Sequence, residues 1–184
     1  YNGGSMYISQ ANISFLKCVF EANKSKNSGG AIEISGNSSP SFESCTFKNN
    51  YLEIDDGNNS SYGGAINIEQ PYTDYTKNNP IKITNSKFIS NYIKSKNSGY
   101  GGAITSSRAS QIINSVFIKN HVISNTDDSD YDESYGGAIH ADNTWWNGSQ
   151  SVGMDMVIVN STFDGNYIKT ATDGAYKKIN TDAA

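Results

Sequence analysis

Positive charge, cysteine and long apolar runs are all scarce in this sequence. Lysine and arginine together make up 14 of the 184 residues, Arg108 is the single arginine, and the formal net charge is −4. Nucleic-acid binding needs clustered basic side chains that neutralise phosphates, so the composition argues against a nucleic-acid partner. No apolar run approaches the length of a membrane span, and no signal peptide opens the chain. We therefore expect no membrane span in this segment.

Apolar residues are also few for a compact globule. They account for 36% of the chain, and the mean hydropathy is −0.55. Such a composition suits a thin coil that has one apolar inner stripe and polar residues elsewhere. Asparagine, serine, tyrosine and glycine would form the outside of that coil.

What the sequence does contain is a repeat built from two short motifs. The first, Gly-Gly-Ala-Ile, begins at Gly29, Gly63, Gly101 and Gly136, with a looser copy at Gly3. The second reads Phe-x-x-Asn and alternates with the first. Two motifs that alternate five times indicate a solenoid, in which stacked coils bury one another's apolar stripes. The paired glycines suit a corner that needs a positive φ or leaves no room for a Cβ.

Apolar residues fall at alternate positions around both motifs, as at Ile32 and Ile34, which is the period of a β-strand. We expect about three short strands in each coil, a turn three residues before each Phe, and parallel stacking of coils at ~4.8 Å. An inner Asn could then satisfy its amide through the neighbouring coils. The two predicted inner ladders are Phe20, Phe47, Phe88, Phe117 and Phe163, and Asn23, Asn50, Asn91, Asn120 and Asn166.

These two motifs resemble the repeat of the chlamydial polymorphic outer membrane proteins and related adhesin-like proteins. The resemblance extends over nearly the whole chain. It implies an all-β fold, a right-handed parallel β-helix, here of about five coils with long loops from the second coil onward. It also implies a surface or adhesin-like protein, and no catalytic or ligand residue comes with the motif.

A solenoid has no separate cores, so we expect residues 1–184 to form a single β-helix segment. Neither end of the sequence has the polar cap that an open solenoid needs, and we interpret the sequence as an excerpt of a longer repeat protein. Its partners would be further coils or domains of the same protein, or other copies of it. Repeat type and polarity favour a secreted or cell-surface location.

The two cysteines, Cys18 and Cys45, occupy equivalent places in adjacent coils, where later coils carry serine. Their Cα atoms should lie ~4.8 Å apart, within the range of a disulfide, but side chains stacked in parallel rarely have the required torsion. We favour two stacked thiols over a disulfide.

The loops hold the candidate ligand residues. Alternate aspartates suit a calcium loop, although a solvated acidic loop is the preferred interpretation, and we predict no other cofactor. Two adjacent tryptophans beside asparagines suit a sugar platform, although covering the helix flank or a neighbouring chain is slightly favoured. Glycans are thus candidate partners, and sequons mark candidate glycosylation sites, while Asn23 should be unreachable in its ladder. The residues are Asp128, Asp130 and Asp132; Trp145 and Trp146; and Asn12, Asn37, Asn58, Asn59, Asn147 and Asn160.

Many right-handed β-helices cleave polysaccharides, so the outward residues of the Gly-Gly-Ala-Ile strand matter. Glu69 and Asp142 would lie two coils apart, roughly 10 Å, near the long end for an inverting carboxylate pair. A lyase would need a basic residue beside the substrate carboxylate, and Arg108 is alone. We therefore predict no catalytic site. The expected solvent-facing residues are Glu33, Asn67, Thr105 and His140, and, two positions on, Ser35, Glu69, Ser107 and Asp142.

These features favour a structural or adhesive extracellular module, a rigid spacer that displays variable loops on a cell surface or in an extracellular assembly. A carbohydrate-binding module that uses the tryptophan loop is the alternative. A pectin-lyase-like enzyme that cleaves glycans is the less favoured one.

Overall fold

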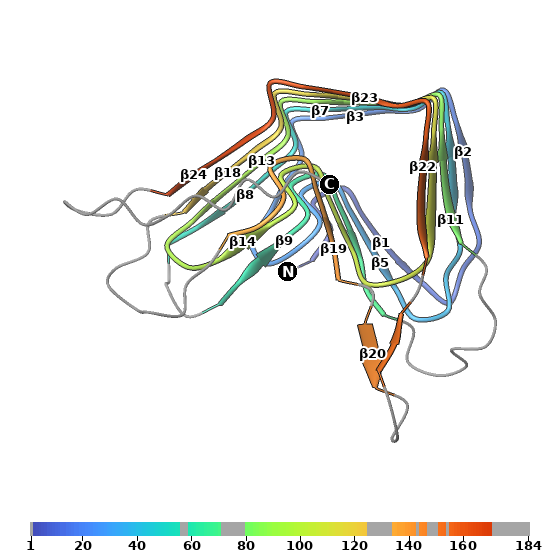
Figure 1. Cartoon of the computed structure of the whole chain (residues 1–184), viewed down its shortest axis with the longest axis horizontal. Coiled ribbons are helices and arrows are strands. Elements are labelled where there is room, and N and C mark those ends of the chain that lie inside the picture. The colour runs from blue at the N-terminus through green and yellow to red at the C-terminus, as the bar shows by residue number, and fades with distance from the viewer. Residues whose placement is uncertain are drawn as a thin grey trace.

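The chain folds as a right-handed parallel β-helix of about five coils (Figure 1). The computed structural model describes residues 2–55, 59–70, 80–124, 134–142, 144–146, 151–153 and 155–170. Within these ranges every regular element is a β-strand. The predicted fold class is therefore confirmed. The candidate calcium ligands Asp128, Asp130 and Asp132 lie outside the described residues, as do Asn58 and Asn147.

Four parallel sheets form the walls, and each takes one strand from every coil. The first sheet contains β1 (Met6–Ser9), β5 (Ile32–Ser35), β10 (Ile66–Ile68), β15 (Ile104–Ser106) and β19 (Ile139–Ala141). The second contains β2 (Ser14–Leu16), β6 (Ser41–Glu43), β11 (Ile81–Thr84), β16 (Ser110–Ile113) and β22 (Met156–Val159).

The third and fourth sheets follow in each coil. The third contains β3 (Val19–Glu21), β7 (Thr46–Lys48), β12 (Lys87–Ile89), β17 (Val116–Ile118) and β23 (Thr162–Asp164). The fourth contains β4 (Lys24–Ser25), β8 (Tyr51–Ile54), β13 (Tyr92–Ser95), β18 (His121–Ser124) and β24 (Tyr167–Thr170). Two smaller pairs complete the fold: parallel β9 (Ser61–Tyr62) and β14 (Gly99–Tyr100), and antiparallel β20 (Thr144–Trp146) and β21 (Ser151–Gly153).

Each coil thus has four main strands, and the expectation of about three was wrong. The additional strand begins directly after the Asn of each Phe-x-x-Asn motif and belongs to the fourth sheet. This sheet extends away from the first three as an arm, and β9 and β14 return along it (Figure 1). Leu52, Ile93 and Val122 form a small core of their own here. With at most two inward apolar residues per coil, and none in coil one, the arm has little periodicity in the sequence.

The corners between sheets are made by residues with a positive φ. Between the second and third sheets the φ angle is 54° at Lys17, 54° at Ser44 and 51° at Asn85. This confirms the predicted turn three residues before each Phe. A second left-handed corner, which was not predicted, precedes each ladder Asn, for example at Ala22 with a φ of 55°. A single left-handed residue turns the strand sharply, and the side chain after it points inward again.

The paired glycines meet both expected requirements. The first of each pair has a positive φ, 67° at Gly63, which favours glycine. The second is crowded by the next coil, because a Cβ on Gly64 would lie 2.1 Å from the carbonyl oxygen of Gly102. The motif is therefore a steric requirement of a corner at which adjacent coils touch through their backbones.

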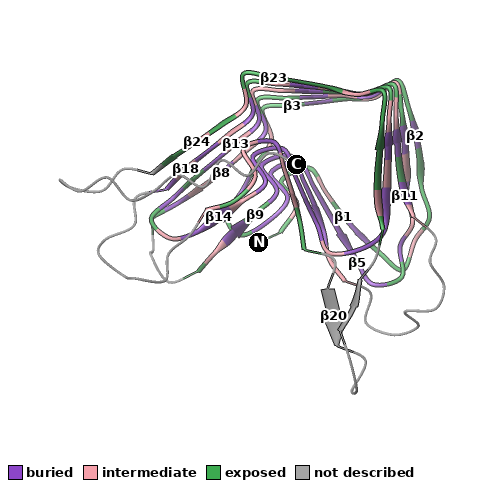
Figure 2. Ribbon diagram, in the orientation of Figure 1, coloured by how far each residue is buried: buried purple, intermediate pink, exposed green. Residues whose placement is uncertain are grey.

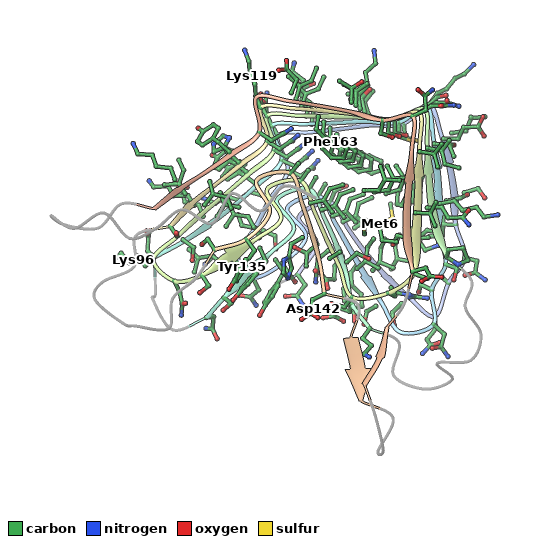
Figure 3. All side chains as sticks on the ribbon, in the orientation of Figure 1. Met6, Lys96, Lys119, Tyr135, Asp142 and Phe163 are labelled. Carbon is green, nitrogen blue, oxygen red and sulfur yellow. The ribbon has the colours of Figure 1, made fainter. Side chains whose placement is uncertain are left out.

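The predicted phenylalanine ladder is present in the main core. Consecutive rings from Phe20 to Phe163 stack with centroids 4.7 to 4.8 Å apart and interplanar angles of 3° to 7°. Purple strands mark this buried interior in Figure 2, and Figure 3 shows Phe163 directed into it and Lys119 away from it. Phe47, Phe88 and Phe117 are fully buried, whereas Phe163 in the last coil is 46% exposed. Ring stacking at the coil spacing adds to the burial energy of each ring.

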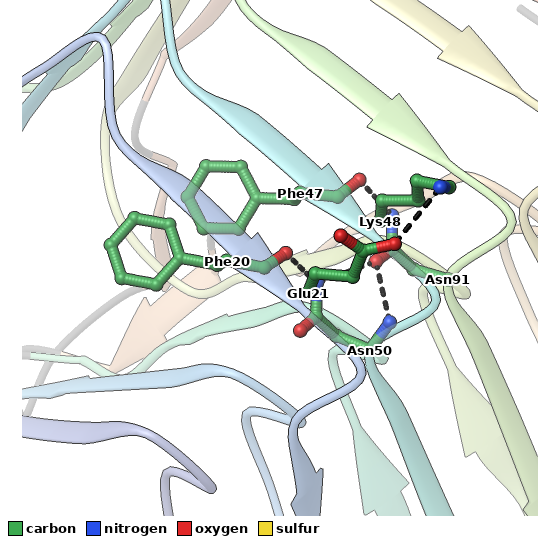
Figure 4. A network of polar contacts seen from close by, with 6 residues as sticks. All are labelled: Phe20, Glu21, Phe47, Lys48, Asn50 and Asn91. Carbon is green, nitrogen blue, oxygen red and sulfur yellow. Dashed lines mark hydrogen bonds and ion pairs between the residues drawn. The ribbon is translucent and has the colours of Figure 1, made fainter.

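The predicted asparagine ladder is present too, and in each of its Asn-to-Asn bonds the side-chain amide donates to the Asn of the following coil. Nδ2 of Asn50 donates to Oδ1 of Asn91 at 2.9 Å and to the carbonyl oxygen of Phe20 at 2.9 Å. The backbone N–H of Asn50 donates to the same Oδ1 at 3.0 Å. Figure 4 shows this network beside the exposed Lys48–Glu21 ion pair. Each fully satisfied amide ties one coil to both of its neighbours.

Cys18 and Cys45 stack in adjacent coils as free thiols. Cys45 is buried, and its burial raises the pKa of its thiol. The structure thus agrees with the interpretation as stacked thiols. Among the described residues there is no helix of the length and apolarity needed to cross a membrane.

Candidate functional site

The chain turns a corner at each glycine pair. The residue immediately before the pair therefore lies beside the residue five positions further along the chain, which belongs to the first sheet. The preceding residues of coils three to five are Tyr62, Tyr100 and Tyr135, which we call the tyrosine row. Tyr62 and Tyr100 are paired in register through β9 and β14, and a parallel bridge joins Tyr100 to Tyr135. Their ring centroids are 5.1 and 5.8 Å apart, with interplanar angles of 10° and 18°. The rings therefore stack along the β-helix axis and present their edges sideways.

The residues that follow the glycine pair form the strands of the first sheet, and a row of polar residues lies on the outward face of that sheet. Its inner polar row consists of residues paired in register, Glu33, Asn67, Thr105 and His140. These residues were expected to face solvent, and that expectation was wrong: Glu33, Asn67 and Thr105 are buried and His140 is half-buried. The segments that precede the glycine pairs cover them: Ser28 is hydrogen-bonded to Glu33, and Oγ1 of Thr105 donates to the carbonyl oxygen of Tyr100.

A second row lies two residues further along the same strands. Glu69, Ser107 and Asp142 form this outer polar row, and their backbone N–H groups continue the ladder of the first sheet. Glu69 and Ser107 are half-buried and Asp142 is exposed, whereas Ser35, at the same place in coil two, is fully buried. This position is thus accessible in coils three to five and also in coil one, where the equivalent residue, Ser9, is exposed.

Aromatic contacts join the tyrosine row to the first sheet. The ring of His140 lies 5.0 Å from that of Tyr100 and 5.8 Å from that of Tyr135, centroid to centroid. In Figure 3, Tyr135 lies towards the arm and Asp142 lies at the end of the first sheet. Burial lowers the pKa of His140, although the charge of Asp142 opposes this effect. His140 is therefore kept neutral at pH 7.

Glu33 is the only carboxyl group that is fully buried in the described part of the chain. Its Oε1 accepts a hydrogen bond from Nδ2 of Asn67 at 2.9 Å, and its Oε2 has no hydrogen-bond partner. Burial raises the pKa of Glu33 to about 8; hydrogen bonds from Ser28 and Asn67 oppose the rise, and the nearby charge of Glu69 adds to it. Glu33 is consequently a neutral acid at pH 7.

Arg108 is not available to a ligand at these rows. Its side chain is buried, and Nη1 donates a hydrogen bond to the carbonyl oxygen of Gly36 at 3.1 Å. No lysine or arginine belongs to the three rows. A carboxylate ligand would therefore meet acidic and neutral groups here. Within the described ranges, no group of three or more His, Cys, Asp or Glu side chains is placed to bind a metal ion.

The structure places the other predicted site residues individually. Trp145 and Trp146 belong to β20, which forms a hairpin with β21 immediately after the outer polar row. Four sequon residues are exposed: Asn12, Asn37, Asn59 and Asn160. The Oδ1 of Asn12 accepts a hydrogen bond from the Ser39 N–H at 2.7 Å, and the Nδ2 of Asn160 donates one to Asn114 at 2.7 Å. Asn23 donates to Asn50 in the ladder, as expected.

Sequence reasoning missed the tyrosine row and the acid at Glu33. A signal for the row was present, because tyrosine immediately precedes the glycine pair at Gly63, Gly101 and Gly136. No such signal existed for Glu33, whose burial depends on the strand segment that crosses over it. Comparison with models of known protein families, with curated proteins and with solved structures finds no match to this chain.

Proposed function

We propose that this chain is a structural or adhesive module of a secreted or cell-surface protein, a rigid spacer that displays variable loops. The supporting observation is where the coils vary in length. The links between the second and third sheets, and between the third and fourth, have two residues in every coil. Length varies only after strands of the first and fourth sheets. This division keeps the walls constant while the displayed segments diverge.

The long segments recur at the same two places. Residues 55–60 and 125–133 follow the fourth-sheet strands β8 and β18, and residues 69–80 and 142–155 follow the first-sheet strands β10 and β19. Surface display of such loops is the role that the resemblance to adhesin-like repeats also implies. Rigidity is supported by the two ladders, which give every coil the same contacts with the next.

The proposal is tested by replacing residues 71–79 with a peptide epitope in the full-length protein. We expect antibody to label intact cells that express this variant, and the unfolding midpoint to change little. The matched control inserts the same epitope between Asn85 and Ser86, at a constant two-residue corner, where folding should fail. Labelling only after lysis would contradict a surface role.

We also propose that the segment is not an enzyme. The buried Arg108 and the sequestered carboxyl group of Glu33 support this view, because neither can reach a polysaccharide as they stand. Release of reducing ends from any of a panel of plant and microbial polysaccharides, and its loss in Glu69→Gln or Asp142→Asn, would overturn it.

A further inference from the structure

The two cysteines replace a serine that links the later coils. Ser86, Ser115 and Ser161 hold in coils three to five the position that Cys18 and Cys45 hold in coils one and two. The Oγ of each serine accepts the backbone N–H of the equivalent residue in the preceding coil, at 3.1, 3.2 and 3.1 Å. Sulfur is a weaker acceptor than a hydroxyl oxygen. The hydrogen bonds between coils therefore do not explain why two adjacent coils carry cysteine here.

The two thiols lie next to each other in the main core. The strands on both sides of them pair in register, and the N–H of Thr46 donates to the carbonyl oxygen of Cys18 at 2.9 Å. Cys45 is buried, and Cys18 is half-buried and packs against the same core. Burial raises the pKa of the Cys45 thiol, and the neighbouring Cys18 thiol adds to the rise. The pair thus forms one site, which solvent can reach through Cys18.

The spacing of the coils decides what can link two stacked sulfur atoms. Side chains in register lie ~4.8 Å apart. A disulfide needs sulfur atoms about 2.05 Å apart, so both side chains would have to turn out of their parallel stacking. Two metal–sulfur bonds in line, each of about 2.3 Å as in zinc sites, span about 4.6 Å. The stacked pair therefore matches a linear, two-coordinate metal ion better than a disulfide.

Thiolate ligands select soft metal ions, of which Cu(I) accepts linear coordination by two sulfur atoms. We propose that Cys18 and Cys45 bind one Cu(I) ion in linear coordination between the sulfur atoms of coils one and two. Binding replaces the two thiol protons, which pass to solvent, and leaves a bis-thiolate complex with a single net negative charge. The backbone N–H of Cys18, which is hydrogen-bonded to the Cys45 thiol, is placed to stabilise that charge. This site goes beyond the spacer role and does not depend on it.

The proposal is tested by titrating the reduced chain with Cu(I) under nitrogen, in competition with a chromophoric Cu(I) chelator. We expect one ion per chain, two sulfur ligands in the X-ray absorption spectrum and a higher unfolding midpoint. Cys18→Ser and Cys45→Ser should each weaken binding at least about a hundredfold, because even the loss of a residue that only supports a metal ligand costs about 10–100-fold. Both variants should fold, since serine occupies this position in coils three to five.

A matched variant moves the pair to the other end of the β-helix. Ser115 is buried and Ser161 is half-buried, as Cys45 and Cys18 are, and they are equivalent residues of adjacent coils. Ser115→Cys with Ser161→Cys, introduced into the Cys18→Ser, Cys45→Ser chain, should restore the binding of one ion. A folded variant that binds none would contradict the argument from spacing.

Three further results would overturn the proposal. The first is undiminished affinity in the Cys18→Ser, Cys45→Ser chain. The second is an ion that joins two chains, which sedimentation would detect as a dimer. The third is a Cys18–Cys45 disulfide in protein purified without a reductant. None of these results would affect the epitope experiment, so failure of metal binding and failure of surface display can be told apart.

Discussion

The buried acid at Glu33 makes the stability of this β-helix depend on pH. Its pKa is raised from 4.5 to about 8 by burial in the folded chain. Folding therefore favours the protonated form, and the folded chain binds more protons than the unfolded chain between these two values. The contribution of Glu33 to the free energy of unfolding should be greatest below about pH 4.5. It should fall as the pH rises and level off above about pH 8.

The size of the effect follows from the same two values. A difference between 4.5 and about 8 corresponds to at most about 5 kcal/mol, at about 1.4 kcal/mol for each pH unit. That is a large part of the free energy of unfolding of an ordinary domain, about 5–15 kcal/mol. Glu33→Gln removes the titration but keeps an oxygen for the hydrogen bond from Asn67. The variant should therefore lose this pH dependence and be the more stable protein at pH 8.

Urea unfolding of both proteins from pH 5 to pH 9 measures the effect as the difference in their free energies of unfolding. Titrating groups that do not interact with Glu33 cancel in that difference, whereas Glu69, whose charge adds to the shift, contributes to it. Glu21→Gln, which changes an exposed carboxylate paired with Lys48, is the control and should differ from the wild type by a constant small amount. A constant difference for Glu33→Gln across this range would refute the reasoning, because it would mean that Glu33 titrates alike in both states.

Three further predictions concern the ladders and the ring cluster. Phe88→Ala should cost about 3–5 kcal/mol in urea unfolding and Phe163→Ala clearly less, because Phe163 is half exposed; equal costs would contradict the ladder. Asn91→Ala should cost about 1–3 kcal/mol, since Asn50 loses its acceptor, and a neutral result would mean that the ladder is solvated. NMR should show His140 titrating below its usual range, so that stability falls as the pH drops through about 6.5; a normal titration would show that the ring is solvated.

The sequence alone was sufficient for three of the four walls of this fold. Phe47, Phe88 and Phe117 recur beside the same turn, and a strand of period two that repeats its inward residues can bury them only by stacking. The ladder of Asn50, Asn91 and Asn120 follows from the same register, because an inward amide needs partners in the coils on either side. These features depend on the alternation of inward and outward residues within a strand and on the repetition of the same motif from coil to coil. Both are visible in the amino-acid sequence.

The tertiary structure alone decided what lies outside those walls. The fourth sheet turns the chain back so that Ser28 and Tyr62 cross over the first sheet, and this crossing buries Glu33, which periodicity had placed in solvent. Whether an outward residue is exposed depends on the path of a segment that precedes it by five positions and on the glycine corner between them. The pKa of Glu33 depends on its burial and on Glu69 in the next coil. Both are relations in space that period-two patterning does not encode, because the pattern distinguishes the two faces of a strand but not what covers the outer one.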